Sequence, residues 1–156
     1  MILGFIIKFN ISVSRNKLGG STLILGHHYQ REEIIKFADL RGDSFKLSQY
    51  AATQRGVDNI IFCGVHFMAE TADILSAPNQ NVILPNLAAG CSMADMAETE
   101  DVKDCWNALL DIVGRDVVTP VTYMNSTAAI KALCGKNGGI VCTSSNASAA
   151  FNWAYE

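Results

Sequence analysis

The sequence lacks the patterns of a disulfide-linked, zinc-binding or nucleic-acid-binding domain. Its 5 cysteines are an odd number without any Cys-x-x-Cys pair, so neither a disulfide framework nor a zinc knuckle is predicted. A total of 12 Lys and Arg against 15 Asp and Glu gives a net charge of -3. No basic run is present, so a nucleic-acid partner is not expected. A Walker A loop and a G-x-G-x-x-G fingerprint are also missing.

Long hydrophobic runs are absent as well. The apolar start, residues 1–7, is far too short to cross a bilayer and has neither a basic leader nor a small-residue cleavage site. A cytoplasmic protein without a membrane partner is therefore expected. With 156 residues, 49% hydrophobic and 17% charged, the chain has a globular balance and is long enough to bury one good core.

Short apolar segments alternate with helical patterns along the chain. Strands are expected at residues 21–26, 59–63, 81–84, 117–122 and 140–143, and helices at residues 30–40, 44–54, 67–75, 102–113, 127–133 and from residue 145 onward. This alternation predicts an α/β fold of three-layer units, in which parallel sheets carry helices on both faces and the crossovers are right-handed.

An internal likeness suggests how the chain is divided. Residues 121–130 repeat the strand-turn-helix pattern of residues 24–35, which indicates two related α/β units. We expect the first unit at residues 21–98 and the second at residues 99–156, after an atypical N-terminal segment at residues 1–20.

Side chains able to do chemistry follow the ends of the expected strands. They are His27, His28 and Tyr29 after the first strand, Cys91 after the third, Tyr123 and Asn125 after the fourth, and Thr143, Ser144, Ser145 and Asn146 after the fifth. Since open α/β folds bind ligands at the carboxyl ends of their strands, these loops are expected at one rim of the sheets. The structural alternative for each histidine is a polar tip that nearby backbone satisfies.

For two groups of polar residues, helix capping and ligand binding are both possible roles. Residues 143–146 precede a helix, and their hydroxyl and amide groups suit the capping of its first N–H groups. The same N–H groups bind anions, so Ser144 or Ser145 can also donate to a carboxylate or phosphate. Asp43 and Ser44 have the same two interpretations at the start of the helix that follows them.

Cys91 differs from the other cysteines in its surroundings. Cys63 and Cys142 lie in apolar strand patterns, while Cys105 and Cys134 lie in helical patterns as packing or surface residues. Only Cys91 lies in a loop of small residues, where backbone can approach a cofactor closely. It is therefore the candidate ligand or nucleophile.

Two acidic residues have a structural rather than a catalytic interpretation. Glu70 and Asp95 are expected near helix starts, where a negative charge favours the helix dipole. Neither is predicted to act as an acid or base.

Taken together, the motifs resemble those of the quinolinate synthase family. The matching segments are 26–30 (Gly-His-His-Tyr-Gln), 42–44 (Gly-Asp-Ser), 62–72, 84–85, 89–95 (Ala-Gly-Cys-Ser-Met-Ala-Asp), 123–126 (Tyr-Met-Asn-Ser) and 142–147 (Cys-Thr-Ser-Ser-Asn-Ala). They follow the order of the family and cover nearly everything from Thr22 onward. The set is highly specific.

The resemblance implies a transferase of NAD biosynthesis. The family condenses iminoaspartate with dihydroxyacetone phosphate to quinolinate, with loss of phosphate and water, and a link to an enzyme that produces iminoaspartate is implied. The implied fold has three similar α/β units around a pseudo-threefold axis, each giving one cysteine to a 4Fe-4S cluster. The iron that has no cysteine ligand acts as a Lewis acid toward a substrate oxygen.

Carried over position by position, the resemblance assigns roles to particular side chains. Cys91 corresponds to the first cluster ligand. His27 corresponds to a histidine that binds substrate carboxylate and moves protons, and Tyr29 joins it in ordering the intermediate. His28 occupies a position where the family usually has Asn, so it is left out of the catalytic set. The other substrate-binding positions are Ser44, Tyr123, Asn125 and Ser144.

The resemblance covers the first one and a half of the three units. The other two cluster cysteines have no counterpart in this chain, and residues 1–17 do not match the usual N-terminal helix of the family. We therefore expect a fragment that is inactive alone, because one thiolate cannot hold a 4Fe-4S cluster. The alternative is a non-catalytic α/β module that binds small anions, or a gene remnant.

Overall fold

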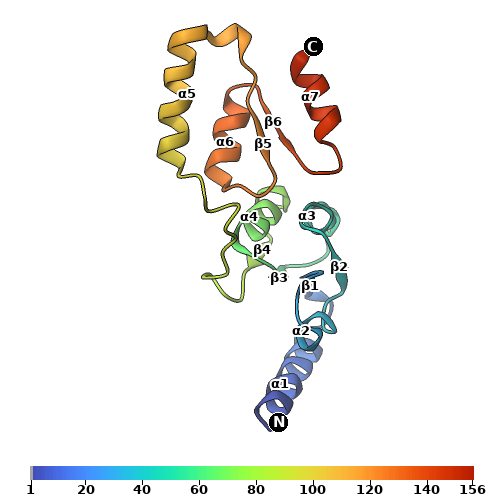
Figure 1. Cartoon of the computed structure of the whole chain (residues 1–156). Coiled ribbons are helices and arrows are strands. Elements are labelled where there is room, and N and C mark those ends of the chain that lie inside the picture. Colours follow the sequence, from blue (N-terminus) through green and yellow to red (C-terminus); the bar gives the residue numbers. More distant parts are fainter. Residues whose placement is uncertain (1) are drawn as a thin grey trace. The chain divides into compact units, whose positions relative to one another are not determined.

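The computed structural model describes residues 2–156, with side chains from Lys8 onward (Figure 1). The chain divides into two compact units, Met1–Ala89 and Gly90–Glu156. Parallel strands with helices on both faces form an α/β fold, as the sequence predicts. Among the helices within residues 2–156, none has both the length and the hydrophobicity needed to cross a membrane.

The first unit is built on a parallel four-stranded sheet with the order β2-β1-β3-β4. Its strands are β1 (Thr22–His27), β2 (Leu40–Gly42), β3 (Asn59–Cys63) and β4 (Asn81–Ile83). The central strands β1 and β3 are the richest in apolar residues, and Leu25, Ile60 and Phe62 are completely buried. Strands that are covered on both faces have this composition in parallel sheets.

Helices cover both faces of this sheet. They are α1 (Ile2–Leu18), α2 (Glu32–Ile35), α3 (Ser44–Thr53) and α4 (His66–Leu75), with a 3₁₀ turn at Gly19–Ser21. The helices α3 and α4 pack together, and α3 buries Leu47 and Ala51 completely. On the opposite face, Ile35 of α2 packs against Gly26 of β1, and α1 lines a cavity of about 270 Å³ over Ile24 and Ile61.

The second unit has two parallel strands, β5 (Val121–Tyr123) and β6 (Ile140–Cys142). Its helices are α5 (Thr99–Val113), α6 (Ala128–Lys136) and α7 (Ala147–Tyr155), with a 3₁₀ turn at Arg115–Val117. Figure 1 shows α6 and α7 on opposite sides of the strands, with α5 next to α6. The buried apolar residues of this unit are Ala94, Met124, Ile130, Cys134, Cys142 and Ala150.

The structure contradicts the helix expected at residues 30–40. Only Glu32–Ile35 is α-helical, and residues 40–42 form β2. Asp39 is the cause, because its backbone N–H donates to the carbonyl of Ile24 at 2.7 Å and its carboxylate accepts from the Ile24 N–H at 2.8 Å. These two bonds hold the chain against the edge of β1, where Leu40 pairs with Leu25.

Other boundaries also differ from the expected ones. The strand expected at residues 117–122 begins only at Val121, after Pro120, which has no backbone N–H to give to a ladder. The division between the units falls before Gly90 rather than after residue 98. The loop that contains Cys91 therefore belongs to the second unit, where Ala94 is buried.

We expect Gly139→Ala to destabilise the second unit by about 1–3 kcal/mol. A Cβ at this position would lie 2.0 Å from the carbonyl oxygen of Pro120 and 2.7 Å from Cys134 Sγ. Gly135→Ala on α6 is the control, because no atom lies within 4 Å of its Cβ and alanine favours a helix. Urea unfolding measures both variants, and equal free energies of unfolding would contradict the close approach at Gly139.

Candidate functional site

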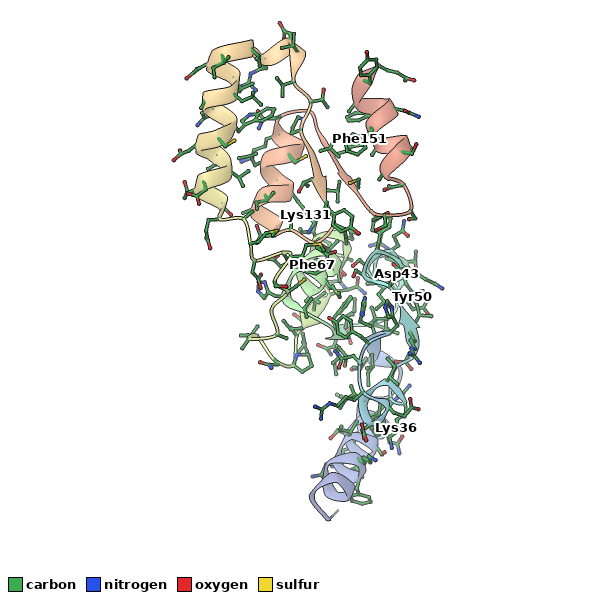
Figure 2. The ribbon with its side chains drawn as sticks, viewed as in Figure 1. Lys36, Asp43, Tyr50, Phe67, Lys131 and Phe151 are labelled. Atoms are coloured by element: carbon green, nitrogen blue, oxygen red, sulfur yellow. The ribbon has the colours of Figure 1, made fainter. Side chains whose placement is uncertain are left out.

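The carboxyl ends of β1 and β2 bring predicted site residues together in the first unit. Parallel pairing places His27 opposite Gly42, so the end of β1 lies beside the loop that starts α3. Asp43, labelled at this helix start in Figure 2, accepts a hydrogen bond from the Lys46 N–H at 2.9 Å and caps α3. Asp43 is therefore the cap, and Ser44 is available for another contact. Its Oγ lies 3.4 Å from His27 Nε2.

His27 is buried, with only 6% of its surface exposed. The rings of His28 and Tyr29 lie against it, with centroids 4.1 and 4.0 Å away. Burial is the main reason that the pKa of His27 falls from 6.5 to about 4, with a further lowering by His28 and an opposing effect of Asp43. The imidazole is therefore neutral at pH 7. Within the described residues its buried Nδ1 has no hydrogen-bond partner.

A neutral His27 limits the chemistry of this cluster. Without a ligand it carries no charge at pH 7, so one ring nitrogen donates a hydrogen bond while the other accepts one. The Ser44 hydroxyl and the phenol of Tyr29, which is 50% exposed, add two more neutral polar groups. The cluster suits hydrogen bonding to a polar ligand.

Tyr123 and Ser144 form a second cluster, at the carboxyl ends of β5 and β6. Tyr123 lies opposite Cys142 in the parallel register, and its hydroxyl oxygen lies 2.5 Å from Ser144 Oγ. The N-cap residue of α7, Asn146, makes no capping bond, because its side chain accepts from the Thr143 N–H at 2.6 Å. Two hydroxyl groups thus lie next to a helix start that has no side-chain cap, which suits a phosphate or carboxylate.

Cys91 and Asn125 form the third contact among the predicted residues. Asn125 lies in the turn after β5, and its Nδ2 donates to Cys91 Sγ at 3.7 Å. Asp95 accepts from the Cys91 N–H at 2.8 Å. The interpretation of Asp95 as a helix-dipole charge is wrong, because α5 begins only at Thr99 and the carboxylate is bonded to the cysteine loop.

The other cysteines have structural surroundings. Cys134 Sγ lies 3.1 and 3.3 Å from the carbonyl oxygens of Pro120 and Ile140, either of which can accept its single S–H. Burial raises the pKa of Cys134 and of Cys63. Cys105 is exposed on α5 and unpaired. Cys91 is therefore the thiol whose surroundings fit a ligand, with an amide N–H directed at its sulfur.

The donor set for a metal centre is incomplete within the described residues. No group of three or more His, Cys, Asp or Glu side chains in that part of the chain is arranged to hold a metal ion. A 4Fe-4S cluster is held by several thiolates. Cys91 fits as one ligand, but in the described part of the chain it does not belong to a group of three or more potential ligand side chains.

A cavity of about 590 Å³ in the second unit adjoins Tyr123 and Asn125. Most of its lining comes from apolar side chains such as Trp106 of α5, and its acidic residues are Glu98 and Asp101. The carboxylates of Glu98 and Asp101 would repel an anion. This cavity is therefore not the predicted anion site.

The predicted site residues thus form three groups. The groups are His27 with Tyr29 and Ser44 in the first unit, and Tyr123 with Ser144 and Cys91 with Asn125 in the second. Two further residues support these groups. Asp43, one of the two cap candidates in the sequence, caps α3 and leaves the Ser44 hydroxyl for His27, and Asp95, whose contact with Cys91 the sequence did not predict, holds the Cys91 backbone. Asp43 and Ser44 both suit a cap by residue type, and the bond from the Lys46 N–H identifies Asp43.

Comparison with known proteins gives consistent matches. Residues 11–156 match the profile of the family described as Quinolinate synthetase A protein. The chain is 60% identical to a quinolinate synthase of Acidobacterium capsulatum over 146 residues, which are 93% of this chain and 39% of that protein. It is 62% identical to a quinolinate synthase of Nocardioides sp. over 139 residues, 89% of this chain and 35% of that protein. It is 58% identical to a quinolinate synthase of Corynebacterium glutamicum over 146 residues, which are 94% of this chain and 37% of that protein. The chain thus spans less than two fifths of the length of these curated relatives.

The free energy of unfolding should fall as the pH is lowered from 6.5 towards 4, because His27 takes up its proton at a higher pH in the unfolded chain than in the folded one. The unfolded imidazole takes up its proton near pH 6.5 and the folded one only near pH 4. Above the higher value both states are neutral and His27 has no effect. Between the two values the unfolded state binds more protons, so the free energy of unfolding decreases, by about 2 kcal/mol at pH 4.5.

Urea unfolding of the wild type and of His27→Gln at pH 7 and 4.5 measures this decrease in the free energy of unfolding. The variant should lose most of the pH-dependent decrease, whereas His28→Gln should keep most of it, because burial rather than His28 is the main cause of the lowered pKa. The same decrease in His27→Gln as in the wild type would show that His27 is not buried as a neutral ring.

Proposed function

This chain belongs to the quinolinate synthetase A family, and we propose that it forms part of a quinolinate synthase of NAD biosynthesis. The proposed reaction condenses iminoaspartate with dihydroxyacetone phosphate to quinolinate, with loss of phosphate and water. The observation that carries the proposal is the contact of His27 with Tyr29 and Ser44 at the carboxyl edge of the first sheet. Neutral groups that donate, accept and transfer protons suit a condensation in which imine, carbonyl and hydroxyl groups interconvert.

His27 is proposed to bind the dicarboxylate substrate through hydrogen bonds and to move protons. Its pKa of about 4 keeps it neutral in the cytoplasm, where we place the protein. The ring therefore donates an N–H to a carboxylate oxygen or accepts a proton at the other nitrogen, without first losing a charge. Ser44 Oγ, 3.4 Å from Nε2, orients the ring, and the half-exposed Tyr29 separates it from solvent.

Tyr123 and Ser144 are proposed to bind an anionic group of a substrate. Their two hydroxyl groups are 2.5 Å apart next to the start of α7, a helix of nine residues. Hydroxyl donors and free N–H groups at a helix start together favour phosphate or carboxylate oxygens. Asn125, which lies two residues after Tyr123, is proposed to contact substrate as well as the Cys91 sulfur.

Cys91 is proposed as one thiolate ligand of a 4Fe-4S cluster. When bound, such a cluster supplies a Lewis acid for a substrate oxygen. The described residues offer no group of three potential ligands, so we propose that this chain acts only within a protein of the length of its relatives and is inactive alone. The protein then depends on an enzyme that produces iminoaspartate.

The second candidate function is a non-catalytic module that binds small anions. It is favoured by the combination of an intact Tyr123–Ser144 pair with an incomplete donor set for iron. Loading with iron and sulfide separates the two candidates, because the module would bind phosphate without forming a cluster.

In the full-length protein, meaning this chain together with the remaining length of its relatives, Cys91→Ser should abolish the visible absorption of the cluster and quinolinate formation. The reason is that a hydroxyl is a poor substitute for a thiolate ligand to iron. Purification without oxygen and absorption spectroscopy provide the measurement.

Cys105→Ser is the matched control, because this thiol is exposed on α5 and should leave the cluster unchanged. A Cys91→Ser protein that kept both cluster and activity would contradict the assignment of Cys91. A full-length wild type that formed no cluster at all would favour the non-catalytic module.

A further inference from the structure

Two hydrogen bonds between the backbone of Cys91 and Asp95 close the loop that contains Cys91. The carboxylate of Asp95 accepts from the Cys91 N–H at 2.8 Å, and the Asp95 N–H donates to the Cys91 carbonyl oxygen at 2.9 Å. Both polar groups of the Cys91 backbone are therefore bonded to Asp95. The loop needs this connection because no helix or strand runs through residues 90–95.

Gly90 makes room for this arrangement. A Cβ at Gly90 would lie 2.6 Å from Oδ2 of Asp95, the same oxygen that accepts from the Cys91 N–H. Any larger side chain would displace the carboxylate from its bond. The neighbouring Ala94 is 2% exposed, which fixes the middle of the loop in the interior of the second unit.

The sulfur of Cys91 is held separately, from the turn after β5. Asn125 Nδ2 lies 3.7 Å from Cys91 Sγ. The turn is itself ordered, because Met124 is buried and the Ser126 N–H donates to the Met124 carbonyl at 2.9 Å. Cys91 is thus fixed at its backbone by one residue and at its sulfur by another, both within the second unit.

We propose that Asp95 is a positioning residue that fixes Cys91 so that its sulfur accepts the amide N–H of Asn125. This inference rests on the proposed role of Cys91 as an iron ligand and adds to it the residue that directs the ligand. Asp95 is exposed and its carboxylate is bonded to the Cys91 N–H, so its proposed effect is exerted through Cys91. Hydrogen bonds to ligand sulfur raise the reduction potential of a cluster and hold the ligand in place.

Asp95→Ala and Asp95→Asn provide the test in the full-length protein, loaded and purified without oxygen. Alanine removes the acceptor, so the cluster should be lost to a chelator at least about tenfold faster, and its midpoint potential should become more negative. Asparagine retains an oxygen that can accept the Cys91 N–H, so Asp95→Asn should behave like the wild type. Both variants remove the negative charge, but only Asp95→Asn keeps the acceptor. Faster cluster loss in Asp95→Ala alone would therefore show that the hydrogen bond, and not the charge, is responsible.

Asn125→Ala provides a second, independent measurement. It should shift the midpoint potential in the same direction, and the double variant with Asp95→Ala should add little, because both changes remove the same N–H···S bond. If Asp95→Ala does not fold, Gly90→Ala takes its place, since its Cβ would displace the same carboxylate.

The outcomes distinguish this inference from the proposed function. Unchanged cluster loss and unchanged potential in Asp95→Ala, together with loss of the cluster in Cys91→Ser, would overturn the positioning role and leave the iron assignment intact. A cluster that survives in Cys91→Ser would overturn the iron assignment itself. Shifts that Asp95→Asn fails to rescue, or additive shifts in the double variant, would also contradict the positioning role.

Discussion

Parallel pairing of neighbouring strands is the constraint on which the rest of both units depends. In the first unit β1 pairs with β2 and with β3 in the same direction, so their carboxyl ends meet at one edge. The contact between His27 and Ser44 follows, because one ends β1 and the other lies just after β2. In the second unit the same pairing of β5 with β6 brings Tyr123 to Ser144.

The neutral state of His27 follows from its place in that sheet. Side chains alternate between faces, so His27 shares the face of Leu25, which is completely buried. His28, the next residue, lies in the turn after the strand and is exposed. The two adjacent histidines therefore differ in burial, because His27 is the last residue of a buried strand. The Asp43 cap completes the arrangement by leaving the Ser44 hydroxyl for the His27 ring.

Much of this arrangement could be predicted from the sequence. Apolar runs such as Ile24–Leu25 and Ile60–Phe62 identify buried strands, and the alternation with helices predicts a parallel sheet. The strand β2 could not be predicted, because three residues with an arginine at the centre carry no strand pattern. Its formation depends on two tertiary bonds between Asp39 and Ile24.

The parts of the site that escaped prediction depend on contacts between residues that have no fixed spacing. Asp95 was expected to be a helix-dipole charge, but α5 begins only at Thr99, after this residue, and only the structure shows its bond to Cys91. The contact of Asn125 with the Cys91 sulfur joins positions 34 residues apart. The choice between Asp43 and Ser44 as cap was open for a different reason, since both residue types cap helices well and only the observed bond decides.

The most direct test of the account is the rate of quinolinate formation by the cluster-loaded full-length protein with Ser44→Ala and with Ser48→Ala. Both serines lie in α3, but Ser44 faces His27, whereas Ser48 is buried and donates only to the Ser44 carbonyl. We expect that Ser44→Ala lowers kcat/KM by roughly tenfold or more, because a hydrogen bond at the reacting groups is lost, while Ser48→Ala leaves it nearly unchanged. Equal activity of both variants and the wild type would show that the carboxyl edge of the first sheet is not where this protein binds its substrate.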